Sequence, residues 1–454
     1  MDEPLFEELP VQARPETPCG GRPRVRAPER RQVEWRALSL DDLLPAEHRA
    51  RLVWAFVERL DLGPLYAAIQ AVEGGPGRPP ADPRVLMALW LYATIEGVGS
   101  ARGLARLCRE HLACQWLCGG VGMNHKTLAD FRVGHGALLE RLLIDGFAAL
   151  LQAGVASLER VAQDGVRVRA AAGAASFRRC ATLRECRRLA EQQIERLRAE
   201  IDADPGAASR RQVAARERAA AERLRRVEAA LAAAEQLAAQ RAARTVRDGK
   251  AKQKRAARAA SQAAPAATPA RASTTDPEAR VMKMADGGWR PAYNAQFAAD
   301  TRSGLIAGVA VDNVGSDMGK MAPLNDHLAA AYGVRPREHL VDGGFAKLDD
   351  IVALAAAGVR VYAPVPQPRA GDRDPHVPLP DDPPAVAEWR QRMGTDAAKM
   401  IYRERAATAE CANAQARNRG LIRLLVRGTA KVKAVLLWFA LAHNMACLWR
   451  LAPA

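Results

Sequence analysis

The sequence predicts an α/β layered domain that carries one large helical insertion and is preceded by an all-α region. Apolar residues recur at helical spacing from Leu40 to about Ala153, and strand-like runs alternate with helices after residue 154. Residues 178–260 differ from both regions, because Ala, Arg, Glu and Gln dominate them. Alternation of strands with helices is typical of a sheet covered by helices.

The composition favours a nucleic-acid partner. The 454 residues include 67 Lys and Arg against 51 Asp and Glu, a formal net charge of +16. Each phosphate that Lys or Arg neutralises releases counterions, so this excess suits a polyanion. The longest apolar stretch, Ala434 to Ala442, is too short to span a bilayer, and no membrane partner is expected. The acidic N-terminus does not fit a secretory signal, and the scattered cysteines indicate a reducing cytoplasm.

Three of the cysteines form a cluster with two histidines. Cys108, Cys114 and Cys118 lie near His111 and His125 and could in principle hold zinc. They lack the Cys-x2-Cys spacing of zinc knuckles and stand among apolar residues at helical intervals. We interpret them as buried helical thiols.

The N-terminal third predicts a helical DNA-binding domain. Residues 1–34 are rich in Pro, Arg and Glu and are expected to be a flexible segment. Residues 35–153 form short helices separated by tight turns, a pattern typical of helix-turn-helix-like DNA readers. Lys126 and Arg132 are candidate DNA contacts. A helical packing or dimerisation domain is the alternative interpretation.

Residues 155–170 change to a period of two, with Asp164, Val166 and Val168 on one side of a predicted strand that bends at Gly165.

The segment 178–273 then predicts a basic helical hairpin and a linker. Two leucine-rich stripes flank the break 204–206, the pattern of an antiparallel coiled coil.

The hairpin region holds most of the positive charge. Residues 178–260 contain 22 Lys and Arg against 11 Asp and Glu, a local excess of +11. Such a run is either a solvated face or a surface that follows a DNA backbone. The Ala-, Lys- and Pro-rich tail 251–273 is expected to be a mobile linker.

Residues 154–177 and 274–454 are together expected to form the α/β domain. The predicted strands are 281–284, 292–299, 305–311, 339–341 and 359–363. The predicted helices are 322–332, 348–357, 395–420 and 431–451, with a Pro-rich loop at 364–384.

Two strand-borne carboxylates are followed directly by glycine, in Asp164-Gly165 and Asp342-Gly343. Glycine removes a side chain that would obstruct a metal or a phosphate. In-line displacement at phosphorus uses two Mg²⁺ ions about 3.5–4 Å apart, and such hard cations bind carboxylate oxygens. An Asp-Gly pair alone is weak evidence, since most such dipeptides are turns.

The sequence around the two Asp-Gly pairs makes them stronger evidence. Six segments match one family in order: 161–170, 275–283, 291–296, 340–345, 402–411 and 441–444. With them, the chain from about Leu40 to Leu451 resembles the DDE transposases of bacterial insertion sequences, in the branch related to the IS-five and IS-eleven-eighty-two groups. The resemblance implies a ribonuclease H-like catalytic domain in which Asp164, Asp342 and Glu410 are the catalytic, metal-binding carboxylates.

The resemblance also implies the conditions of the reaction. It implies two Mg²⁺ ions, for which Mn²⁺ can substitute, and no nucleotide cofactor. The expected partners are DNA, as terminal inverted repeats and target DNA, and a second copy of the chain in a homodimer on DNA. The expected location is the bacterial cytoplasm, associated with the nucleoid.

The helix that carries Glu410 offers further candidates for DNA contact. On an α-helix, Arg403, Glu410, Asn413 and Arg417 share one stripe. Some related transposases place an Arg four residues before the Glu, after a Tyr. Here Arg405 stands five residues before Glu410, so the stripe makes Arg403 a rival to Tyr402 and Arg405.

Two alternatives remain open. The chain could be a non-catalytic DNA-binding protein derived from a transposase, or a related nuclease that cuts without strand transfer. Both would keep the same domains, and the nuclease would use the same carboxylates.

Overall fold

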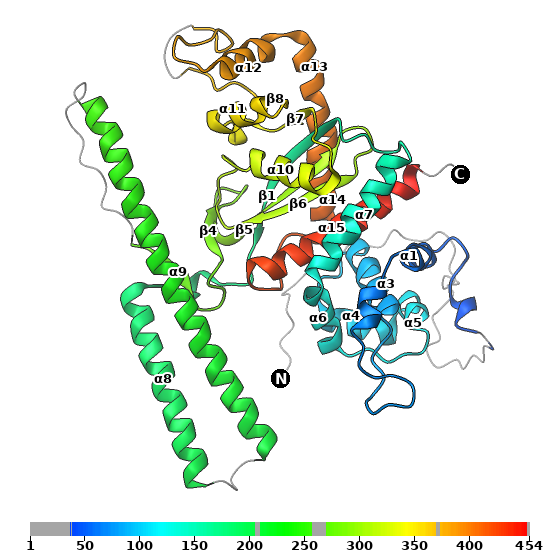
Figure 1. Ribbon diagram of the computed structural model, residues 1–454. Helices are drawn as coiled ribbons and strands as arrows, with labels where there is room; N and C mark the ends of the chain where they lie inside the picture. The colour runs from blue at the N-terminus through cyan, green and yellow to red at the C-terminus, as the bar shows by residue number, and fades with distance from the viewer. Residues whose placement is uncertain (1–36, 38, 205–208, 257–268, 369–372, 452–454) are drawn as a thin grey trace, which may run out of the picture.

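The computed structural model describes residues 37, 39–204, 209–256, 269–368 and 373–451. The segment 1–34, expected to be flexible, lies outside the described residues. Figure 1 shows a central sheet with helices around it, a long helical hairpin that projects from one side, and the N-terminal helices packed at the other. The described chain is therefore a mixed α/β protein with an N-terminal helical region, as the sequence predicts.

The central sheet is mixed. β1 lies between β5, which is antiparallel to it, and β7, which is parallel to it, and β8 continues the sheet beyond β7. β4 and β6 pair with different parts of β5. The strands are β1 (Arg160–Arg169), β4 (Arg280–Lys283), β5 (Trp289–Asp300), β6 (Ile306–Asp312), β7 (Glu338–Leu340) and β8 (Arg360–Tyr362). The predicted strands are confirmed, including the strand that carries Asp164.

Helices cover both faces of this sheet. Leu324 and Leu328 of α10 pack beside Gly308 of β6, while Val166 and Phe297 face the core that contains α15. The helices after β6 are α10 (Met321–Tyr332), α11 (Leu348–Ala356), α12 (Pro384–Gly394), α13 (Asp396–Arg405), α14 (Cys411–Asn418) and α15 (Thr429–Leu451). The sequence interpretation missed α12, which begins with Pro384 at its first turn and buries Trp389.

The long C-terminal helix α15 passes along β6. Its span Thr429–Arg450 is long and apolar enough to cross a membrane, but 78% of the 18-residue apolar window within that span is buried inside the protein. Asn444 bonds both backbone groups of Ile306 in β6, with distances of 2.7 and 2.8 Å. The neighbouring His443 is buried and its Nε2 lies 2.9 Å from the carbonyl of Gly304. The 441–444 motif thus ties α15 to the sheet.

The N-terminal helices share their core with α15. They are α1 (Arg49–Glu58), α2 (Gly63–Ala67), α3 (Pro83–Ile95), α4 (Ala101–Glu110), α5 (Leu112–Cys118), α6 (His125–Gly134) and α7 (Gly136–Gln152). One hydrophobic cluster joins these helices, α15 and the sheet. Trp438 of α15 is buried, and its indole N–H donates to the carbonyl of Arg132 at 2.9 Å. Cys114 and Cys118 lie buried in α5.

The hairpin leaves and rejoins the core through a small second sheet. β2 (Phe177–Arg179) pairs with β3 (Arg271–Ser273), and α8 (Cys180–Ala203) packs along α9 (Arg210–Ala256). Helix α9 therefore extends into the segment 251–273 that was expected to be a linker, and β3 forms the last three residues of that segment. Residues 257–268 of that tail lie outside the described residues.

Candidate active site

Asp164 stands in the middle of β1 and is only 19% exposed. Its Oδ1 accepts a hydrogen bond from the backbone N–H of Gly165, and its Oδ2 accepts one from Asn413 Nδ2, both at 2.9 Å. Burial raises the pKa of Asp164, and the charge of Asp342 adds to this, while Arg405 and Asn413 oppose it. The site therefore holds a carboxylate whose negative charge is incompletely compensated by the protein.

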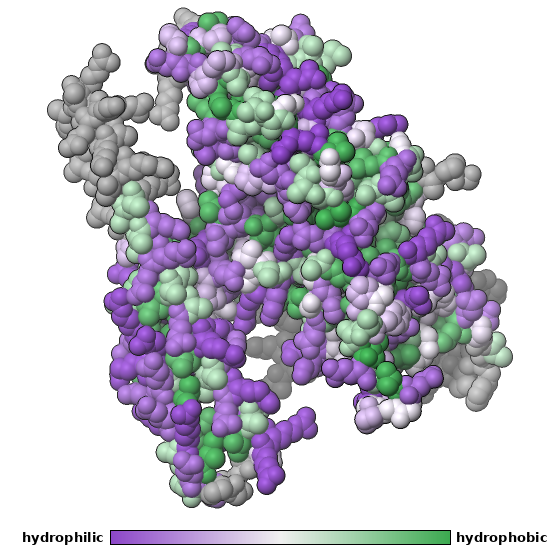
Figure 2. All heavy atoms as spheres, in the orientation of Figure 1, coloured by the Kyte–Doolittle hydropathy of each residue, from purple (hydrophilic) through white to green (hydrophobic). Residues whose placement is uncertain are grey.

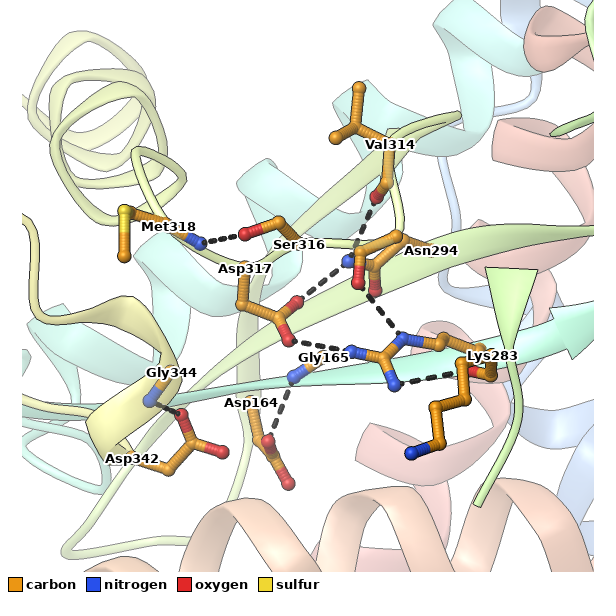
Figure 3. Close-up of polar contacts among 12 residues, drawn as sticks. Asp164, Gly165, Lys283, Asn294, Val314, Ser316, Asp317, Met318, Asp342 and Gly344 are labelled. Carbon is orange, nitrogen blue, oxygen red and sulfur yellow. Dashed lines mark hydrogen bonds and ion pairs between the residues drawn. The ribbon is translucent and has the colours of Figure 1, made fainter. Parts of the chain in front are cut away.

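Gly165 faces away from this carboxylate. Figure 3 shows Asp164 on one side of the strand and Asp317 and Asn294 on the other. A Cβ at Gly165 would lie 2.3 Å from Gln296 Nε2 and 2.4 Å from Asp317 Oδ1. Glycine is thus required for packing behind the strand. The expectation that Gly165 clears space for a metal or phosphate is wrong, because successive residues of a strand point to opposite faces.

The group behind the strand is a polar network that sequence reasoning missed. Asp317 accepts hydrogen bonds from Asn294 Nδ2 at 2.6 Å and Gln296 Nε2 at 2.7 Å. Arg167 approaches Asp317 to 3.6 Å and donates to the backbone carbonyls of Gly315 and Lys283. These bonds fasten β1, β4 and β5 to the loop before α10. Asp317 lies in a loop with no local motif, so its sequence neighbourhood offered no signal.

Asp342 follows β7, the parallel neighbour of β1. It begins the short helical turn Gly343–Phe345, where its Oδ1 accepts a hydrogen bond from the N–H of Gly344 at 2.8 Å. Figure 3 shows Asp342 and Asp164 on the same side of the sheet. Their mutual repulsion contributes to the raised pKa of Asp164. The parallel pairing of β1 with β7 explains why two acids far apart in sequence meet here.

Glu410 is reached through a π-helical turn. The helix predicted over 395–420 is interrupted by a π-helical segment at Ala406–Glu410, between α13 and α14. Arg405 Nη2 donates to Glu410 Oε1 at 2.6 Å, and Arg405 Nη1 lies 4.0 Å from Asp164 Oδ2. The same guanidinium lies 5.8 Å from the centre of the Tyr402 ring. π-helical turns are frequent at functional sites.

This turn corrects the expected stripe. Arg403 is exposed, whereas Arg405 is 13% exposed and contacts the carboxylates. In an α-helix five residues span about 500°, which would turn Arg405 about 140° away from Glu410. A π-helical turn closes over five residues, so it brings Arg405 back to the side of Glu410. The arginine that contacts the candidate carboxylates is therefore Arg405 and not Arg403.

The segment before the π-helical turn is anchored by a second ion network. Arg160 Nε donates to Glu338 Oε2 at 2.6 Å, and Arg160 Nη1 donates to Glu404 Oε1 at 2.5 Å. Thr408 Oγ1 in turn donates to the carbonyl of Glu404 at 2.9 Å. Because Glu404 directly precedes Arg405, these contacts hold the end of α13 against β1 and β7. The sequence interpretation named none of these residues.

The remaining candidates for DNA contact are dispersed. Arg417 is exposed on α14, Tyr402 is half-buried under Arg405, and Lys126 is exposed in the first turn of α6. Arg132 is only 8% exposed, and its guanidinium donates to the carbonyl of Gly99 and lies 4.7 Å from the Trp90 ring. Burial lowers the pKa of Arg132 to about 10. The expectation that Arg132 contacts DNA does not hold, because its side chain is part of the helical core.

The donor set fits a hard cation in its chemistry. In the ranges that the structure covers, no three His, Cys, Asp or Glu side chains gather as closely as ligands of one metal ion. Instead, Asp164 and Glu410 lie on either side of the Arg405 guanidinium. The buried Asn413 Oδ1 accepts no hydrogen bond from any residue that the structure describes, although the amide nitrogen of Asn413 bonds Asp164. Carboxylate and amide oxygens are the ligands that Mg²⁺ and Ca²⁺ use.

Comparison with known families gives two matches. Residues 38–133 match a family described as "Transposase domain (DUF772)", and residues 382–449 match one described as "Transposase DDE domain". The second match includes Glu410 and Arg405 and excludes Asp164 and Asp342. No curated protein and no solved structure matches the chain.

Proposed function

We propose that this chain is a DDE transposase that cuts and joins the ends of an insertion sequence by two-metal phosphoryl transfer. Its matches to a transposase domain over residues 38–133 and to a transposase DDE domain over residues 382–449 support this proposal. Asp164, Asp342 and Glu410 are the proposed metal-binding carboxylates. The observation that carries this assignment is Arg405, whose guanidinium lies 4.0 Å from Asp164 and 2.6 Å from Glu410. It links a strand acid to the acid of the DDE domain.

The strand order supports a ribonuclease H-like catalytic domain. Three antiparallel strands, β6, β5 and β1, are followed across the sheet by the parallel strands β7 and β8. This arrangement puts an acid in the central strand and an acid at the end of its parallel neighbour. The hairpin enters this domain after β1 and leaves it before β4, so it is an insertion in the chain order.

The side chains of the site would have distinct roles in the reaction. Asp164, Asp342 and Glu410 would hold two Mg²⁺ ions, which activate the attacking oxygen and steady the leaving oxygen when bound. Asn413 orients Asp164 through its amide N–H and presents a buried carbonyl oxygen to the same space. Arg405, with Tyr402 beside it, carries a planar donor set that can bond a phosphate at two points.

The proposal is tested by incubating the protein with Mg²⁺ and DNA from its own flanking repeats, and measuring cutting and joining. Each of Asp164→Asn, Asp342→Asn and Glu410→Gln should lower cutting by at least about 100-fold, more than the loss of an outer-shell partner usually costs. DNA binding should persist in all three.

Asp349→Asn is the matched control, because this carboxylate is 85% exposed on the helix after Asp342. It should cut as the unaltered protein does. A variant of Asp164, Asp342 or Glu410 that cuts at the control rate would remove that residue from the metal site. Cutting without any joined product would favour the nuclease alternative.

A further inference from the structure

A cleft separates the helical hairpin from the α/β core. Its volume is about 870 Å³, and it opens between one face of α9 and the start of α15. The side chains around it include five cations: Arg225, Arg226, Arg280, Arg427 and Lys431. Figure 2 shows mainly hydrophilic residues over the hairpin. The cleft is thus a strongly charged surface that the catalytic site does not use.

Three acidic side chains also line the cleft. Glu222 pairs with Arg225 at 3.0 Å, and Glu278 accepts the N–H of Thr429 at 2.9 Å. Asp276 is fully buried and accepts the Tyr293 hydroxyl at 2.8 Å. With five cations against these three carboxylates, the lining of the cleft has a formal net charge of +2.

Two of the cations at the core side are available for a ligand. Arg427 and Lys431 are exposed, and neither forms an ion pair with any residue that the structure describes. They lie just before α15 and in its first turn. Exposed cations without local partners keep their full charge for an anion that approaches from solution.

A second groove on the hairpin adjoins the cleft at Arg226. It lies between α8 and α9, has a volume of about 650 Å³, and shares Arg226 with the cleft. Its charged residues are Arg196, Arg216, Arg223 and Arg226 against Glu200. From Arg216 to Gln236, α9 covers about 30 Å at its rise of about 1.5 Å per residue. That length approaches one turn of duplex DNA, about 34 Å.

The strand register relates this surface to the catalytic carboxylates. Arg280 of β4 lies opposite Ala292 of β5, and Ala292 lies opposite Arg169 of β1. Arg169 is five residues beyond Asp164, which is about 17 Å along a strand. Arg280 therefore lies about half a helical turn of DNA from Asp164, measured along the sheet.

We propose that the cleft and the groove together form a track that holds the phosphate backbone of duplex DNA next to the cut end. This inference rests on the proposed function and deepens it, because it assigns the contact that positions the DNA. In this proposal the Arg and Lys side chains of the track contact phosphates, which every duplex presents whatever its sequence. The track should therefore strengthen binding to any duplex and depend steeply on salt.

The test uses the full chain and a duplex of about three helical turns without divalent metal, so that no cutting is needed. Affinity is measured between about 50 and 200 mM salt for the unaltered protein and for an Arg427→Ala/Lys431→Ala variant. Each lost phosphate contact should reduce the slope of log affinity against log salt by about 0.9. The double variant should therefore lose about 1.8 from this slope, equally for terminal-repeat and unrelated DNA.

An Arg302→Ala/Arg337→Ala variant removes the same charge at the opposite end of the sheet and is the matched control. Arg302 is exposed, and Arg337 is 77% exposed. The control should keep the slope of the unaltered protein. Equal slopes for the cleft variant and the control would overturn the track, as would a cleft variant that changes only the oligomeric state. A protein that binds with the expected slopes and never cuts would refute the proposed chemistry and leave the track intact.

Discussion

Replacing Gly165 by Ala should destabilise the protein from the side of β1 that faces away from the acids. The new Cβ would lie 2.3 Å from Gln296 Nε2 and 2.4 Å from Asp317 Oδ1. Neither atom can move freely, because Gln296 is 1% exposed and Asp317 accepts bonds from Asn294 and Gln296. Overpacking of a filled core costs about 1–3 kcal/mol, and a lost hydrogen bond to a charged group adds about 1.5–3 kcal/mol. We expect a loss of about 2.5–6 kcal/mol in the free energy of unfolding.

Urea unfolding of Gly165→Ala and Gly173→Ala measures this effect. Gly173 is a matched control, because it is exposed, has a φ of −87°, and would place its Cβ with no atom within 4 Å. Gly173→Ala should change stability by less than about 0.5 kcal/mol. Adding Asp317→Ala to Gly165→Ala should cost at least about 1 kcal/mol less than the sum of the single changes, since it removes one clashing atom. Equal stability of the two glycine variants would refute this account of Gly165.

Two further predictions concern charge and packing. Burial raises the pKa of Asp164, so the folded state binds the proton more tightly than the unfolded chain, and ionisation lowers stability as pH rises above about 4. Without divalent metal, the Asp164→Asn variant should therefore have a larger free energy of unfolding than the unaltered protein at pH 7, and this gain should shrink toward about pH 4. A variant that is instead less stable, by an amount that grows with pH, would show that Arg405 and Asn413 outweigh burial in setting the pKa of Asp164. Trp438→Ala should cost about 3–5 kcal/mol and lower the unfolding midpoint of the N-terminal helices and the sheet together, because Trp438 packs in their shared core. Two separate transitions by calorimetry would contradict a shared core.

Much of the fold follows from local patterns. The alternation around Val166 and Val168 predicts β1, and glycine-separated apolar runs predict β5 and β6. The two leucine-rich stripes predict α8 and α9 because a helix pairs with another helix through such a stripe. The shared core of the N-terminal helices and α15 was not predictable in this way. It depends on contacts such as Trp438 with Arg132, which are 306 residues apart.

The sequence singles out the candidate acids of the site but not the residues around them. Asp164 stands out because it lies within a strand pattern and precedes glycine, and Asp342 because it directly follows a strand pattern and precedes glycine. Glu410 was proposed only through the resemblance. Asp317 carries no such signal, since its partners Asn294 and Gln296 come from another strand. Arg132 was predicted to contact DNA because a cation at a helix end is usually solvated. In this protein its guanidinium instead packs against the Trp90 ring and donates to the Gly99 carbonyl.

The spacing between Arg405 and Glu410 shows how a departure from a family pattern can be resolved by local geometry. Some related transposases have a spacing of four residues between these two positions, and this chain has one residue more. On a regular α-helix, that additional residue would turn Arg405 away from Glu410. The π-helical turn at Ala406–Glu410 absorbs that residue, and the Arg160–Glu404 bond fixes the helix just before the turn. Spacing and turn therefore belong together: deleting one residue within 406–409 should restore a regular helix and keep Arg405 beside Glu410. A straight helix with the five-residue spacing would separate them.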